Sequence, residues 1–199
     1  MVNQLAQDYA SQPVIFLEYD VDDSALSARE WRWWSAYSGS SVTLPMVMVD
    51  SGNRISNGYE DFNAKYSSMV NSSLARDAQA NITATGQRVG NTLHFNVEVE
   101  NRSNVTLSYG NNAAVWVIVY ETFGSSGAGR LTNRFVRVTA STSISSLSPN
   151  GVGNFVVDTP TLDGVVWDNL RAVVLVDYLP TGSPGVYDML QATSVTSFP

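Results

Sequence analysis

The chain has 199 residues, of which 44% are hydrophobic and only 15% are charged, so its composition is that of a globular protein and not a disordered one. Its formal net charge of −7 and scattered arginines argue against nucleic-acid binding, which needs clustered Lys and Arg. The sequence contains no cysteine, which excludes disulfides, thiolate metal sites and thiol catalysis within it.

The first elements of the chain alternate between helix and strand. VNQLAQDYA, from residue 2, has apolar residues at helical spacing, and Pro13 ends that helix. VIFLEYDV is apolar and rich in β-favouring residues, which predicts a buried strand over residues 14–20. DDSALSAREWRWWSAYSG begins with capping side chains and ends at a glycine, which predicts a helix over residues 22–39.

A predicted hairpin and a third helix complete this part. Pro45 precedes the short apolar run MVMVD, and the turn DSGN connects that run to RISNG. Residues 59–76 again carry apolar side chains at helical spacing. Residues 1–77 are therefore predicted to form an α/β domain.

Beyond residue 77 the chain reads as strands and turns. Residues 81–103 predict a hairpin that turns at Gly90-Asn91, with period-two alternation in its second strand. AAVWVIVYETF and LRAVVLVDYL are apolar on both faces, as central strands are. NRFVRVTASTSI, GNFVVDT and VYDMLQATSV supply three further strands. About seven short strands without an immunoglobulin-type cysteine pair predict a fibronectin-like variant of the immunoglobulin-like β-sandwich over residues 78–199.

The order helix, strand, helix, Pro-strand, strand, helix over residues 2–76 resembles the C-terminal two-thirds of thioredoxin. Leu44-Pro45 resembles its cis-proline step, and Gly58 resembles the glycine after its last strand. Together with NRFVRVTAS, VVLVDY and VYDMLQATSV, this part resembles the exported outer membrane proteins related to Omp-twenty-eight, which join a thioredoxin-like domain to an immunoglobulin-like sandwich. The resemblance implies an extracytoplasmic or cell-envelope location, although the first residues do not read as a signal peptide.

The sequence departs from that family in one large respect. It contains neither the cysteine pair nor the central strand that precedes the first helix of a thioredoxin fold. The gap could close by pairing of the strands at 14–20 and 46–49, by a strand from a second copy, or by an upstream segment. We expect the second copy, and hence a homodimer, because both flanking strands are apolar.

Two groups of residues are candidate binding sites. The predicted cis-proline loop of Thr43, Leu44 and Pro45 could bind an extended peptide through its backbone, or it could only shape the turn. The aromatic cluster on the predicted second helix could stack on a sugar or fill a partner's pocket, or it could pack within the protein. This cluster consists of Trp31, Trp33, Trp34 and Tyr37.

Other polar stretches predict no catalytic residue, cofactor or metal site. DVDD, from Asp20, lacks the Gly and Glu that a calcium loop requires at its sixth and twelfth positions, so helix capping is expected. GSSGAG lacks the Lys-Ser/Thr of a phosphate loop and is predicted to be a hairpin tip. The single histidine, His94, lies on the predicted wet face of a strand, with no nucleophile-elbow motif in the chain.

These observations favour a non-catalytic extracytoplasmic binding or structural protein, partnered by itself or by another protein or peptide, with no nucleic acid and no transmembrane segment. Two alternatives stay open. The chain could be a fragment of a thiol–disulfide oxidoreductase whose cysteine-bearing segment lies upstream, which the genomic DNA before Met1 would decide. It could also be a carbohydrate-binding module that uses the tryptophan helix.

Overall fold

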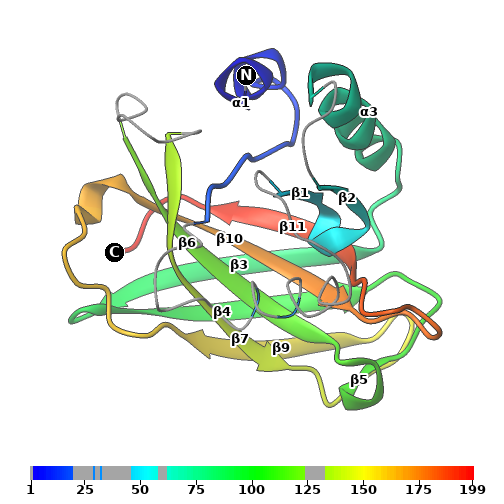
Figure 1. The fold of residues 1–199 in the computed structure, drawn as a ribbon. Coiled ribbons are helices and arrows are strands. Elements are labelled where there is room, and N and C mark those ends of the chain that lie inside the picture. Colours follow the sequence, from blue (N-terminus) through cyan, green and yellow to red (C-terminus); the bar gives the residue numbers. More distant parts are fainter. Residues whose placement is uncertain (1, 20–28, 30–31, 33–45, 58–61, 124–132) are drawn as a thin grey trace.

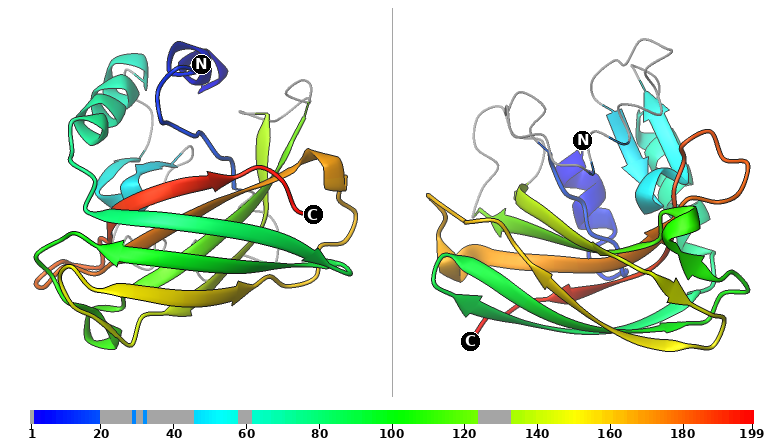
Figure 2. Two further views of the ribbon diagram at one scale, coloured as in Figure 1. Left: turned by 180° about the vertical axis from the view of Figure 1, so that it is seen from behind. Right: turned by 90° about the horizontal axis from the view of Figure 1, so that it is seen from below.

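The computed structural model describes residues 2–19, 29, 32, 46–57, 62–123 and 133–199. Its main body is a sandwich of two antiparallel β-sheets, and the N-terminal elements lie on the outside of one of them (Figure 1). The two sheets and the covering elements are also distinct when the molecule is seen from below (Figure 2).

The sandwich divides into a four-stranded and a three-stranded sheet. The larger sheet has the spatial order β11 (Asp188–Val195), β10 (Leu170–Tyr178), β6 (Ala114–Thr122) and β7 (Arg134–Ser143). The smaller sheet has the order β3 (Ala80–Val89), β4 (Thr92–Asn101) and β9 (Val152–Asp158). Short connecting elements are β5 (Leu107–Ser108), which pairs with β8 (Ser146–Leu147), and the 3-10 turns η2 (Tyr109–Asn111) and η3 (Trp167–Asn169). The predicted β-sandwich is thus confirmed.

The hairpin of β3 and β4 follows the alternation seen in the sequence. The strands pair without interruption from Ala80 opposite Asn101 to Val89 opposite Thr92, and Gly90 at the turn has φ +60°. The inward residues of β4 are at most 2% exposed: Leu93, Phe95, Val97 and Val99. The residues between them point outward, so the prediction of one buried and one wet face is confirmed.

The strands β6 and β10 are neighbours in the middle of the larger sheet and are buried on both faces. Their inner residues join the core between the sheets. Their outer residues form a second apolar cluster, which includes Trp116, Ile118 and Leu175 and is covered by Leu17 and Tyr19 from the N-terminal segment. The apolar character of both faces, read from the sequence, therefore reflects two separate layers of cover.

The N-terminal elements include two helices and a hairpin. They are α1 (Val2–Asp8), β1 (Met46–Val49), the turn η1 (Asp50–Gly52), β2 (Arg54–Asn57) and α3 (Phe62–Leu74). The strands β1 and β2 pair antiparallel across the DSGN turn, where three successive residues have positive φ, so the predicted hairpin is confirmed. A small core of Leu5, Tyr66 and Met69 joins the helices to β1.

The prediction of a strand over residues 14–20 is wrong for the described residues 14–19. This segment makes a single parallel bridge, in which Glu18 N–H donates to the Arg134 carbonyl at 3.0 Å and Val136 N–H donates to the Glu18 carbonyl at 2.9 Å. Among the described strands β1 pairs only with β2, so no thioredoxin-like sheet is shown. The physical reason is that the apolar outer face of β6 and β10 takes up the apolar segment as its cover.

Candidate functional site

The residues singled out from the sequence as binding candidates lie outside the described residues, and their roles stay predictions. They are the predicted cis-proline loop of Thr43, Leu44 and Pro45 and the aromatic cluster of Trp31, Trp33, Trp34 and Tyr37. The same holds for DVDD at 20–23 and for GSSGAG at 124–129. Of the predicted helix over 22–39, Arg29 and Arg32 are described, and both are helical.

A candidate binding surface is the outer face of the sheet β3–β4–β9. None of the described elements lies in front of it when the molecule is seen from behind (Figure 2). The register places its outward residues in four rows of three across the sheet. From one end to the other the rows are Asn81–Glu100–Val152, Thr83–Glu98–Asn154, Thr85–Asn96–Val156 and Gln87–His94–Asp158.

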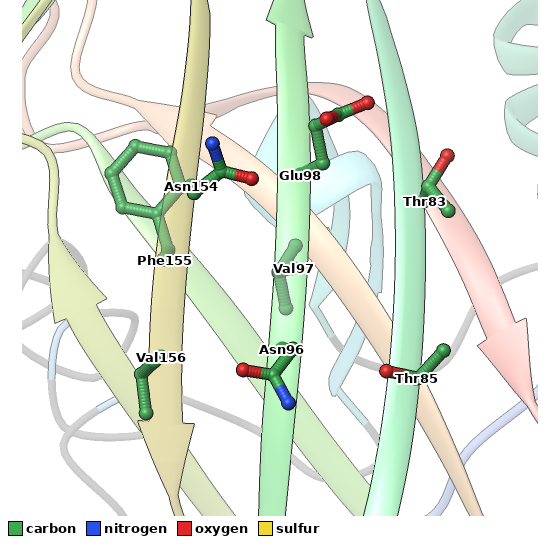
Figure 3. A pocket seen from close by; sticks show the side chains of 8 residues that line it. All are labelled: Thr83, Thr85, Asn96, Val97, Glu98, Asn154, Phe155 and Val156. Atoms are coloured by element: carbon green, nitrogen blue, oxygen red, sulfur yellow. The ribbon is translucent and has the colours of Figure 1, made fainter.

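The two middle rows border a shallow hollow of about 240 Å³. In Figure 3 Glu98 lies between Thr83 and Asn154, and Asn96 lies between Thr85 and Val156. Val97 and Phe155 also line the hollow, although Val97 faces the core and is only 2% exposed. The hollow is smaller and more open than the enclosed apolar pockets that hold drug-sized molecules, so it suits a ligand that lies across the sheet.

The polar side chains of these two rows are free to bind. Within the part of the chain that the structure describes, none of them makes a hydrogen bond or ion pair through its side chain: Thr83, Thr85, Asn96, Glu98 and Asn154. They offer two hydroxyls, two carboxamides and one carboxylate, which together include donors and acceptors. The rows on either side differ, because His94 Nδ1 lies 2.7 Å from Asp158 Oδ1, and Arg102 is bound to Glu100 at 2.9 Å.

A second polar group is buried between the N-terminal segment and the sandwich. Asp177 of β10 is fully buried, and Arg29 Nη1 donates to its Oδ2 at 2.9 Å. Arg32 Nη1 donates to its Oδ1 at 3.2 Å, and Arg32 Nη2 reaches the same carboxylate. Both guanidinium groups also lie over the Trp116 ring, at 5.2 and 5.0 Å from its centroid.

The charges in this cluster compensate one another. Burial alone would raise the pKa of Asp177, but Arg29 and Arg32 outweigh it and hold that pKa below the usual value. Burial lowers the pKa of Arg32, and Asp177 opposes that shift. A carboxylate enclosed by two guanidinium groups has no capacity left for a ligand, so we assign this cluster a structural role.

A third polar group fixes the β1–β2 hairpin and α3 to β11. Arg76 Nη1 donates to Asp50 Oδ2 at 3.0 Å, and Arg76 Nη2 donates to Asp188 Oδ1 at 2.5 Å. Asn53 Nδ2 donates to the same Asp188 oxygen at 2.9 Å, and Ser73 Oγ donates to Asp50. One arginine therefore joins the turn η1, the end of α3 and the first residue of β11.

Sequence reasoning placed the β4 side chains of the hollow on a wet face but did not single out the residues from β3 and β9. Exposed Thr and Asn are common in strands, and only the register shows which of them share a row with Glu98. The buried cluster did carry a signal, because Asp177 interrupts the apolar run LRAVVLVDYL. Arg29 and Arg32 stand three residues apart, which places them on one helix face.

Metal-ion clusters and membrane-spanning helices are both absent from the described residues. No group of three or more His, Asp or Glu side chains is close enough there to hold a metal ion. None of the described helices is long and apolar enough to cross a membrane.

Comparison with known proteins adds little to the geometry. No family model matches the chain. No curated protein matches it either. Among solved structures, the PapD-like domain 7 of human CEP192 aligns over 59% of this chain and 82% of its own length, with 11% identity and a TM-score of 0.31.

Two other solved structures align over shorter shares of their own chains. The Fcho1 mu homology domain of Danio rerio, solved with a bound Eps15 peptide, aligns over 59% of this chain and 43% of its own, with 14% identity and a TM-score of 0.27. The β-glucosidase DesR of Streptomyces venezuelae, solved with D-glucose, aligns over 58% and 15%, with 12% identity and a TM-score of 0.27. At these TM-scores the neighbours assign neither a family nor a function.

Proposed function

We propose that this protein is a non-catalytic binding protein whose ligand lies on the outer face of β3–β4–β9. The observation that carries the proposal is the set of five side chains around the hollow that have no protein partner within the described residues. The outer face of the four-stranded sheet is apolar and is covered by the N-terminal segment, so it is not available to a ligand. Free hydroxyl, amide and carboxylate groups in fixed rows are suited to hydrogen-bonded recognition.

The composition of the hollow favours a neutral, hydroxyl-rich ligand such as an oligosaccharide. The lining contains no Lys or Arg, which opposes an anionic ligand. Apart from Phe155, it also lacks the aromatic residues, Met and Arg in which protein interfaces are enriched. Val156 is 50% exposed and supplies an apolar contact for the C–H face of a sugar ring. Thr and Asn side chains can both donate to and accept from sugar hydroxyls, and the Glu98 carboxylate accepts from them.

The location and ancestry of the chain are part of the same proposal. The division into three and four strands, without a cysteine pair, supports a fibronectin-like variant of the immunoglobulin-like sandwich. The resemblance to the Omp-twenty-eight-related proteins supports an extracytoplasmic place for it, with residues 1–77 as a degenerate thioredoxin-like part. A binding module for polysaccharide in the cell envelope is consistent with both.

A glycan array, followed by titration calorimetry on any glycan that binds, tests the proposal. Glu98→Gln should weaken binding by about tenfold or more, because a hydrogen bond to a charged group contributes about 1.5–3 kcal/mol. Asn96→Ala should weaken binding by about two- to tenfold, because a neutral hydrogen bond contributes about 0.5–1.5 kcal/mol. Asn63→Ala, at an exposed position of α3, is the matched control and should leave binding unchanged.

Two results would overturn this assignment. One is that no glycan binds the unaltered protein. The other is that glycans bind with equal affinity when Glu98 or Asn96 is replaced. If Trp33→Ala abolishes binding while the Glu98 and Asn96 variants do not, the sugar site is the tryptophan helix.

A further inference from the structure

The edges of the two sheets differ in how they are covered. Four strands form these edges: β7, β11, β3 and β9. Glu18 bridges the N-terminal end of β7, which also carries Arg134 and Arg137 and an irregular register opposite β6. The edges of β3 and β11 lie against each other, where Gln79 N–H donates to the Leu190 carbonyl at 3.0 Å and Arg88 N–H donates to the Pro199 carbonyl at 3.3 Å.

Among the described residues β9 lies beside β7 of the other sheet, but no backbone hydrogen bond joins the two strands. β9 pairs with β4 in continuous register from Val152 to Asp158, and no other described strand pairs with it. Exposed edges in monomeric proteins are usually protected by Lys, Pro or a bulge. β9 has none of these, and its sequence VGNFVVD has one charge, at its last residue. Two of its outward side chains are exposed apolar ones, Val152 at 58% and Val156 at 50%.

We propose that β9 pairs antiparallel with β9 of a second copy of this chain, so that the two smaller sheets form one six-stranded sheet. Centring the two-fold axis at Phe155 places Asn154 opposite Val156 of the second copy and Val152 opposite its Asp158. Residues opposite each other then have the same parity, so outward side chains meet outward side chains and the core faces stay continuous.

Symmetry favours a second copy over an unrelated strand, and the proposed register limits the charge repulsion between the two copies. The chain carries a net charge of −7, so self-association requires an interface that keeps carboxylates apart. In this register the two Asp158 side chains lie at opposite ends of the paired strands, about 20 Å apart for six steps of about 3.4 Å. The two Val156 side chains are diagonal neighbours at about 7–8 Å, close enough to cover each other.

Light scattering coupled to size exclusion, at increasing protein concentration, tests for the dimer. The unaltered chain should be a dimer, and Val156→Lys should elute as a monomer at the same concentration, because a lysine on the edge opposes pairing. Val152→Lys provides an independent second variant. Val89→Lys is the control, because Val89 is equally exposed at 56% but lies at the far hairpin tip of β3. Circular dichroism checks that each variant is folded.

Cross-linking tests the register itself, without interference because the chain has no native cysteine. An oxidised mixture of Asn154→Cys and Val156→Cys chains should form disulfide-linked heterodimers in excess of either chain alone, since directly opposed positions meet the distance that a disulfide needs. A monomer at all concentrations, a dimer that survives both lysine variants, or equal cross-linking in all three samples would overturn the proposal. The glycan proposal is tested with variants of Glu98 and Asn96, which lie on β4 and not on the β9 edge. Either proposal can therefore fail while the other holds.

Discussion

At the scale of single residues, Asp177 is the buried carboxylate that pairs with two arginines of the N-terminal segment. It is fully buried, and its carboxylate neutralises Arg29 and Arg32, which are themselves 2% and 12% exposed. Removing one member of a buried ion cluster leaves the others desolvated and unpaired, whereas replacing the whole cluster by apolar residues can be neutral. The cluster is therefore expected to matter for how the N-terminal segment is placed more than for net stability.

Asp177→Asn should lower the free energy of unfolding by about 3–5 kcal/mol in urea denaturation at pH 7. Asp168→Asn, at an exposed position of η3, should change it little. The triple variant Arg29→Met, Arg32→Met and Asp177→Leu should recover most of the loss. If the triple variant is as unstable as the single one, the cluster contributes net stability and the assignment of its role is wrong.

The Asp177 carboxylate also makes the stability of the protein depend on pH. The pKa of Asp177 is lower in the folded than in the unfolded protein. Its contribution to the free energy of unfolding is therefore fully present above the unfolded pKa of about 3.9 and is lost as pH falls through the folded pKa. Urea midpoints of the unaltered protein should be steady above about pH 5 and fall below pH 4. Asp177→Asn should show a smaller fall over that range, and an identical fall would contradict the assignment.

At the scale of elements, Arg76 connects the hairpin turn, α3 and β11 through two carboxylates. Arg76→Ala removes charged hydrogen bonds from a half-buried site, which should cost about 1–3 kcal/mol. The loss should be local, because the core between the sheets does not include Arg76. Hydrogen exchange should quicken in α3 and β2 and stay slow in β6. Arg102→Ala, which removes an exposed ion pair on β4, is the control, and equal acceleration in β6 would show that the two regions open together.

At the scale of the whole molecule, the outer apolar face of β6 and β10 links the sandwich to the N-terminal segment. A truncated chain beginning at Asp77 keeps the core between the sheets and should unfold cooperatively. It exposes the outer cluster around Trp116 and Leu175, so in light scattering it should form species larger than the dimer joined through β9. If the truncated chain is unfolded, the boundary at residue 77 is wrong. If it is folded, equally stable and no larger in association than the full chain, the N-terminal cover is dispensable.

The sequence by itself determined the local elements. Alternation in β4 predicted its buried face, the DSGN turn predicted the hairpin of β1 and β2, and apolar runs predicted that β6 and β10 are central. These features depend on side-chain period and turn residues, which neighbouring positions in the chain fix.

Only the tertiary structure decided which elements cover which faces of the sheets. Residues 14–19 are apolar enough for a strand, but Leu17 and Tyr19 pack on the outer face of the sandwich, and Phe16 packs on the small core of α1 and α3. The rows of the hollow and the pairing of Asp177 with Arg29 likewise join residues far apart in the chain. Whether the edge of β9 is paired also depends on strands that are distant in the sequence. Such contacts are fixed by register and burial over the whole molecule, and no local pattern in the sequence contains them.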